Sequence, residues 1–94
     1  MTAQQIISDL ENYMSTPYSG WYVGITNDTV RRFEEHSVQM DKQHYWIRRD
    51  ADSHTIARQV EKYFLDKGAK GGPGGGDEDS IWIYAYKITS STNP

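Results

Sequence analysis

The sequence contains no cysteine, and only 2 phenylalanines and 3 prolines occur among its 94 residues. The absence of cysteine excludes a disulfide framework, a thiolate zinc site and a cysteine nucleophile. No apolar run approaches the roughly 18 residues of a membrane-spanning helix, and the first residues lack the basic start of a secretory signal. We therefore expect a soluble, cytoplasmic protein that makes no contact with a membrane.

An excess of positive charge is also lacking, because 10 Lys and Arg residues face 13 Asp and Glu residues and leave a formal net charge of −3. Domains dedicated to duplex binding usually carry a large basic excess that neutralises phosphates. Most of the basic residues lie between positions 31 and 70. Nucleic-acid binding is therefore expected to be weak, salt-sensitive and local. The candidate contacts are Arg31, Arg48, Arg49, Arg58, Lys62 and Lys70.

The length limits the chain to one small domain with one core, since 36% of its residues are hydrophobic and a second core needs a longer chain. Within this single domain, 1–94, we expect a helical N-terminal extension over residues 1–17. A Gly-rich loop is expected over residues 68–79, and a flexible tail over residues 89–94.

Apolar side chains at helical spacing predict helices over residues 3–14 and 53–67. Asn27 or Asp28 supplies the cap of a short third helix that ends near Ser37, and its Val30 and Phe33 are expected to face the core. The longest helix begins at a Ser53 or Thr55 cap, and Gly68 follows it as the C′ residue.

Aromatic and β-branched residues predict strands over residues 20–26, 44–49 and 80–88. The last of these is apolar on both alternating faces, which is typical of a central strand. Gly24, inside the first strand, marks a bulge or a close approach to the backbone. The expected fold is α+β, with a small three-stranded, mainly antiparallel sheet flanked by helices.

The segment 68–77 contains six glycines and a proline and cannot hold regular structure. It does not match a phosphate-binding P-loop, because no Gly-Lys-Ser/Thr follows and the run trails a helix. Two interpretations stay open for residues 68–79, a mobile flap beside a functional site and a plain connector. The acidic residues 77–79 are interpreted as a solubilising turn in preference to a divalent-ion cluster.

Residues 21–36 read WYVGITNDTVRRFEEH. This stretch resembles the second half-motif of the GIY-YIG nucleases, in which Tyr-Ile/Val-Gly precedes a helix with an arginine ten positions after the tyrosine and a histidine near its end. The matching residues are Tyr22, Gly24, Arg32 and His36. The resemblance implies a GIY-YIG-like fold and a metal-dependent endonuclease that hydrolyses phosphodiester bonds in DNA or RNA.

A second stretch, IARQVEKYFL at residues 56–65, is similar to the helix that carries the metal-binding glutamate of that family, and Glu61 matches this glutamate. On helical geometry Glu61 lies just beyond the edge of the apolar face of its helix, where a carboxylate can point along the sheet surface. The resemblance therefore implies that Glu61 holds Mg²⁺ or another divalent cation.

Arg32 and His36 are four residues apart and share a helix face, so both can reach one phosphate. Phosphodiester hydrolysis requires a Lewis acid, a cation that stabilises the transition state, and a group that orients or deprotonates water. Glu61, Arg32 and Tyr22 are the candidates for these roles, with His36 as an auxiliary.

The first half-motif of the family, Gly-Ile-Tyr on a preceding strand, is not recognisable, since residues 9–13 read as helix. Tyr13 and Tyr18 are the candidates for its tyrosine. Two functional hypotheses therefore stand beside each other. The first is a GIY-YIG-like endonuclease, and the second is a catalytically degenerate module that binds nucleic acid or a protein partner without cleavage.

Overall fold

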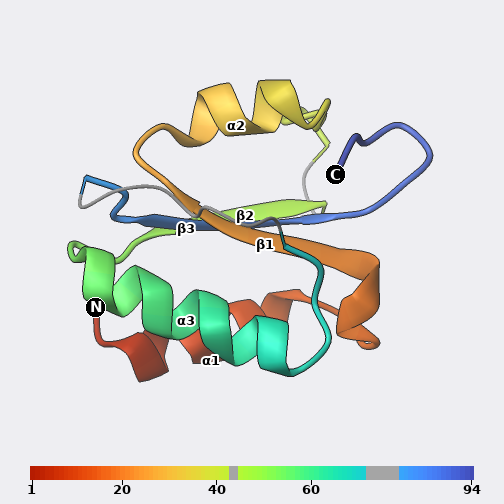
Figure 1. Ribbon diagram of the computed structural model, residues 1–94. Coiled ribbons are helices and arrows are strands. Elements are labelled where there is room, and N and C mark those ends of the chain that lie inside the picture. The colour runs from red at the N-terminus through yellow and green to blue at the C-terminus, as the bar shows by residue number, and fades with distance from the viewer. Residues whose placement is uncertain (43–44, 72–78) are drawn as a thin grey trace.

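The computed structural model describes residues 1–42, 45–71 and 79–94. Three helices and a three-stranded antiparallel sheet form an α+β fold, as the sequence predicts. The helices are α1 (Ala3–Tyr13), α2 (Thr29–Glu35) and α3 (His54–Asp66). Helix α2 covers one face of the sheet, and α1 and α3 cover the other (Figure 1). Within the described ranges no helix combines the length and apolarity that a membrane crossing requires.

Polar side chains fix the start of each helix. Thr2 and Gln5 form a reciprocal capping box at α1, and the Asp28 carboxylate accepts from the Arg31 backbone N–H at α2. The Ser53 hydroxyl accepts from the Ile56 backbone N–H at α3. Each contact satisfies a backbone donor that has no partner within the helix. Of the alternatives that the sequence leaves open, Asp28 and Ser53 are the caps that form.

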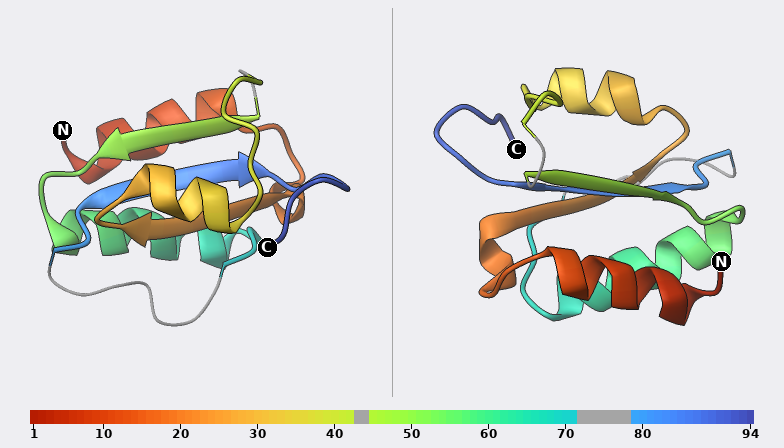
Figure 2. Two further views of the ribbon diagram at one scale, coloured as in Figure 1. Left: turned by 90° about the horizontal axis from the view of Figure 1, so that it is seen from above. Right: turned by 180° about the vertical axis from the view of Figure 1, so that it is seen from behind.

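The sheet consists of β1 (Trp21–Thr26), β2 (Trp46–Asp50) and β3 (Trp82–Lys87), in the order β1-β3-β2. The prediction that the last strand is central is confirmed, since β3 pairs antiparallel with both neighbours. A short 3-10 turn at Tyr18–Gly20, which the sequence analysis does not predict, precedes β1. Figure 2 shows α3 beneath β1 and α1 beneath β2.

The two faces of the sheet have different cores. The face toward α1 and α3 is aliphatic, with buried residues that include Val23, Ile47 and Ile83. The face toward α2 is aromatic, and its buried members are Tyr22, Phe33, Tyr84 and Tyr86. Alternation of side chains along each strand produces this division.

The expectation that Val30 faces the core is wrong, because 47% of its surface is exposed. The buried residues along this segment are Thr29, Phe33 and His36. Their spacing of four and three residues follows one helical face, and Val30 lies beside that face.

The outer edge of β1 is covered by the segment that follows α3. The Val23 N–H donates to the Lys70 carbonyl at 2.8 Å, and the Lys70 N–H donates to the Trp21 carbonyl at 2.8 Å. Gly68 makes the preceding turn with φ +103, which confirms its expected place after the helix. The expected loop continues through residues 72–78, which lie outside the described residues together with most of the predicted acidic turn.

We expect Gly24→Ala to lower the free energy of unfolding by about 1–3 kcal/mol, the usual cost of overpacking a filled site. A Cβ at Gly24 would lie 2.5 Å from the Tyr84 hydroxyl oxygen, which is too close for non-bonded atoms. The matched control is Gly20→Ala, where a Cβ meets nothing within 4 Å. Urea unfolding followed by tryptophan fluorescence measures both, and equal stabilities for the two variants would contradict the close approach.

Candidate functional site

A cleft of about 710 Å³ opens between α2, the start of β1 and the segment that follows α3. Its lining residues come from four separate parts of the chain. They are Ser19, Tyr22, Arg32, His36, Lys70, Gly71, Ile88 and Pro94. The cleft thus brings together the three catalytic candidates of the sequence analysis and one of its candidate nucleic-acid contacts.

Local structure explains why Tyr22, Arg32 and His36 meet. Tyr22 points to the α2 side of the sheet because it alternates with Trp21 and Val23, which belong to the core on the other side. The Asp28 cap fixes the start of α2, and Arg32 and His36 follow one turn apart. The rings of Tyr22 and His36 lie with their centroids 4.7 Å apart.

The Arg32 guanidinium is held by three groups. Its Nε donates to the Tyr84 hydroxyl at 3.4 Å, and one terminal nitrogen lies 3.2 Å from His36 Nε2. The other terminal nitrogen pairs with the half-exposed Glu35 carboxylate at 3.3 Å. The hydrogen bond with Tyr84 is the main reason why the pKa of Arg32 lies above its ordinary value, so the side chain is permanently cationic.

Arg32 also determines the proton position on His36. A guanidinium has donors only, so His36 Nε2 must accept from Arg32 through its lone pair. His36 Nδ1 then carries the proton and donates to the Asn93 carbonyl at 2.8 Å. In this arrangement both ring nitrogens are occupied, and His36 orients Arg32.

Two tyrosines of β3, which the sequence analysis does not single out, complete the site. Tyr86 lies opposite Tyr22 in the register, with ring centroids 5.1 Å apart. Tyr84 lies opposite Gly24, and its hydroxyl occupies the space that the missing Cβ leaves. Two tyrosines separated by one residue on a strand share a face. This spacing is the sequence signal that places Tyr84 and Tyr86 on the same side of the sheet.

The environments of these two hydroxyls differ. Burial raises the pKa of Tyr84 above the ordinary phenol value, and the hydrogen bond and positive charge of Arg32 act in the opposite direction. Burial also raises the pKa of Tyr86 well above its usual range. The Tyr86 hydroxyl is buried and has no hydrogen-bond partner in the part of the chain that the structure describes.

Tyr13 and Tyr18, the sequence candidates for the missing tyrosine, lie in the other layer. The Tyr13 ring packs edge-on against Trp21 at 6.0 Å, and the Tyr18 ring packs edge-on against Phe64 at 5.5 Å. Both tyrosines belong to the margin of the core that α1 and α3 form. The structure therefore does not bring either of them beside Tyr22.

Glu61 is not among the residues that line the cleft. It lies on α3 with 6% of its surface exposed, and its carboxylate is 3.5 Å from the Arg58 guanidinium. Burial raises the pKa of Glu61, while Arg58 and His54 lower it. The negative charge of Glu61 also contributes to the raised pKa of Tyr84, so Glu61 and Arg32 act on the same hydroxyl.

The fit of Glu61 to a divalent cation depends on its donor set. Magnesium keeps several waters and is commonly bound by one or two carboxylates together with substrate phosphates. A single buried carboxylate is compatible with that pattern. Within residues 1–42, 45–71 and 79–94, no three His, Asp or Glu side chains lie close enough together to hold a metal ion. Glu61 is therefore not part of an all-protein metal site there.

The remaining basic candidates do not form one patch. Arg31 is exposed on α2, and Arg48 donates to the Thr29 hydroxyl on the same side of the sheet. Arg49 pairs with Asp9 of α1 on the opposite side. Arg58 and Lys62 belong to α3, where they pair with Glu61 and Asp66.

No family model matches the sequence, and neither the curated proteins nor the solved structures include a match to it.

Proposed function

We propose that this protein is a metal-dependent phosphodiesterase that cleaves DNA or RNA, with a site of the GIY-YIG type. The observation that carries the proposal is the meeting of Tyr22, Arg32 and His36 in one cleft. These three residues are among those that the sequence resemblance selects, and a cleft with a fixed cation and hydroxyl suits a phosphodiester.

Arg32 stabilises the negative charge that develops on the phosphate in the transition state. Such stabilisation is effective when the donor is oriented before the substrate arrives. Tyr84 and His36 contact Arg32 from two sides and restrict its orientation. His36 and Tyr84 therefore act as positioning residues for Arg32, and Lys70 adds a second cation at the rim of the cleft.

Tyr22 lines the cleft, where its hydroxyl orients the attacking water by a hydrogen bond. The strand next to Tyr22 is β3, and we infer that its tyrosines take the structural place of the tyrosine that the family carries on a preceding strand. This strand pairs antiparallel with β1 and sets Tyr84 and Tyr86 beside Tyr22. The order of the two strands along the chain is thus the reverse of the order in the family motif.

Glu61 is the residue that would hold Mg²⁺. When bound, the cation supplies Lewis-acid stabilisation to phosphate oxygens. Glu61 itself contributes a buried carboxylate, and its negative charge acts to raise the pKa of the Tyr84 hydroxyl. A cation beside Glu61 would favour its ionised form and offset the effect of burial.

The second candidate function is a module that binds nucleic acid without cleaving it. The ion pair between Glu61 and Arg58 favours a non-cleaving module, because the Arg58 guanidinium binds the carboxylate that would otherwise bind a metal. The two candidates share the cleft and the phosphate contact of Arg32, and they differ in hydrolysis.

The proposal is tested by incubating the purified protein with branched, single-stranded and duplex DNA and RNA in Mg²⁺, Mn²⁺ or EDTA. Cleavage of at least one substrate is expected with a divalent cation, and none is expected in EDTA. Activity that an Arg32→Ala preparation retains in full would identify a contaminating nuclease. Absence of cleavage on every substrate would favour the binding module.

A further inference from the structure

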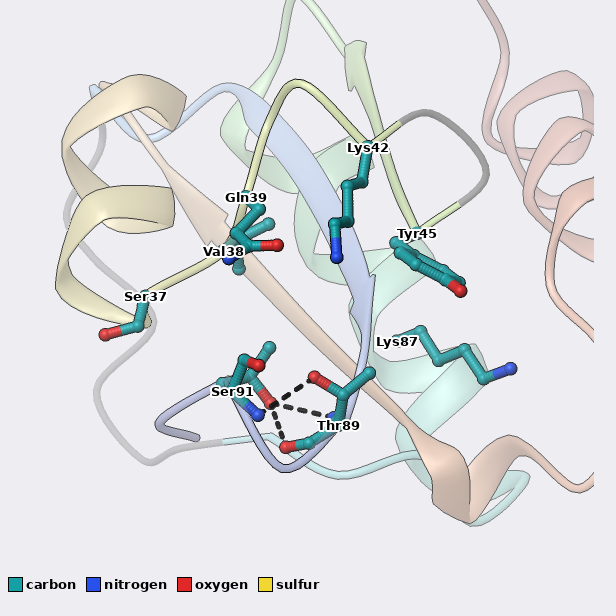
Figure 3. Close-up of a pocket in the computed structure, with 9 residues that line it drawn as sticks. Ser37, Val38, Gln39, Lys42, Tyr45, Lys87, Thr89 and Ser91 are labelled. Atoms are coloured by element: carbon teal, nitrogen blue, oxygen red, sulfur yellow. Dashed lines mark hydrogen bonds between the residues drawn. The ribbon is translucent and has the colours of Figure 1, made fainter.

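A second cavity, of about 180 Å³, lies next to the cleft, between the segment that follows α2 and the segment that follows β3. Figure 3 shows the Lys42 side chain pointing toward the turn around Thr89 and Ser91, with Tyr45 beside it. The Lys87 side chain extends past Tyr45, away from that turn. The lining residues are Ser37, Val38, Gln39, Lys42, Tyr45, Lys87, Thr89, Ser91 and Thr92.

The cavity combines cations and hydroxyl donors with no carboxylate among its lining residues. Neither Lys42 nor Lys87 takes part in any ion pair between the described residues. The Thr89 hydroxyl oxygen accepts from the Ser91 backbone N–H, which leaves its proton free to donate. Ammonium groups and hydroxyl donors together favour an anion such as a phosphate.

Tyr45 adds an aromatic surface at the mouth of this cavity. Tyr45 directly precedes β2, and 41% of its surface is exposed. The Lys87 ammonium lies 5.7 Å from the ring centroid, which places a cation beside the ring. Exposed aromatic rings beside cations are the elements with which proteins bind unpaired bases and their phosphates.

Two segments of the chain border both the cleft and the second cavity. His36 lines the cleft and Ser37 lines the cavity. Ile88 lines the cleft, and its neighbours Lys87 and Thr89 line the cavity. Because consecutive Cα atoms are about 3.8 Å apart, these paired lining residues place the cavity and the cleft side by side.

We propose that the second cavity is a phosphate subsite for a nucleotide adjacent to the one in the cleft, with Tyr45 stacked on its base. The choice of ligand rests on the proposed function. Only an unpaired base offers its face to a tyrosine. The substrate class is therefore single-stranded nucleic acid, or the unpaired part of a branched one.

The test measures fluorescence anisotropy of a labelled single strand of about 12 nucleotides and of the matching duplex, both in EDTA so that no cleavage occurs. Tyr45→Leu is expected to weaken single-strand binding about 5- to 100-fold and to leave duplex binding nearly unchanged. Lys42→Gln is expected to lower the slope of log Kd against log salt by roughly 1. The matched control is Lys67→Gln at the end of α3, because Lys67 is exposed and lines neither the cleft nor the cavity. This variant is expected to bind as the wild type does.

Unchanged single-strand binding by Tyr45→Leu and Lys42→Gln would overturn the subsite, and so would failure of the wild type to bind single strands. The experiment distinguishes failure of the subsite from failure of the proposed nuclease activity. If no substrate is cleaved but both variants lose affinity, the subsite stands and the nuclease proposal fails. If the wild type cleaves and both variants bind as it does, the nuclease proposal stands and the subsite fails.

Discussion

Replacement of Arg32 by alanine is expected to reduce the rate of phosphodiester cleavage by a factor of about 100–1000, the usual effect of removing one preorganised donor to a transition-state charge. The loss should appear in kcat, because the charge develops only in the transition state. The reason lies in the fixed position of the guanidinium between Tyr84 and His36. Initial rates with a labelled oligonucleotide measure the effect.

The control for this variant is Arg31→Ala. Arg31 is the neighbouring residue, but its guanidinium is exposed and contacts Glu35 and Asn27. Its removal should change affinity slightly and leave kcat within about twofold, since exposed ion pairs contribute little. Equal losses in the two variants would show that net positive charge matters and that the position of Arg32 does not.

Replacement of Glu61 by glutamine is expected to lower cleavage at least about 100-fold at a fixed Mg²⁺ concentration, since a neutral amide is a poor ligand for a hard cation. The shape of the side chain is kept, so the fold should persist. Calorimetric titration with Mn²⁺ provides a readout besides activity, and the wild type should bind more tightly than the variant.

Glu34→Gln is the matched control for Glu61→Gln, because Glu34 is an exposed carboxylate on α2. This variant should keep both cleavage and Mn²⁺ affinity. Wild-type behaviour of Glu61→Gln in both measurements would remove Glu61 from the metal site. The role of Arg32 would be unaffected by that result, since it depends on a separate set of contacts.

The local features of the fold are those that the sequence predicts best. Hydrophobic spacing and capping residues locate the three helices, and the apolar run at residues 80–88 identifies β3 as central. These signals act within a few residues of the chain. Val30 shows the limit, because α2 is too short for its sequence to specify which apolar residue meets the sheet.

The part of the site that the sequence predicts is likewise local. Arg32 and His36 are one helical turn apart, and the helix alone brings them together. Tyr84 and Tyr86 reach Tyr22 only through strand pairing across more than 60 residues, and the register that does so is a property of the assembled sheet. Nor does the spacing of basic residues reveal that Arg49 turns toward α1 while Arg48 turns toward α2.

The position of β3 also determines when the sheet can be assembled. Both β1 and β2 pair with β3 and are not neighbours in the sheet, yet β3 follows them in the chain. During synthesis on the ribosome, neither strand has its native partner until residues 82–87 have emerged. The helices can form earlier, since their contacts are local. The sheet is therefore expected to assemble only after β3 is available. Until then, the unpaired edges of β1 and β2 are the parts of the chain most prone to aggregation.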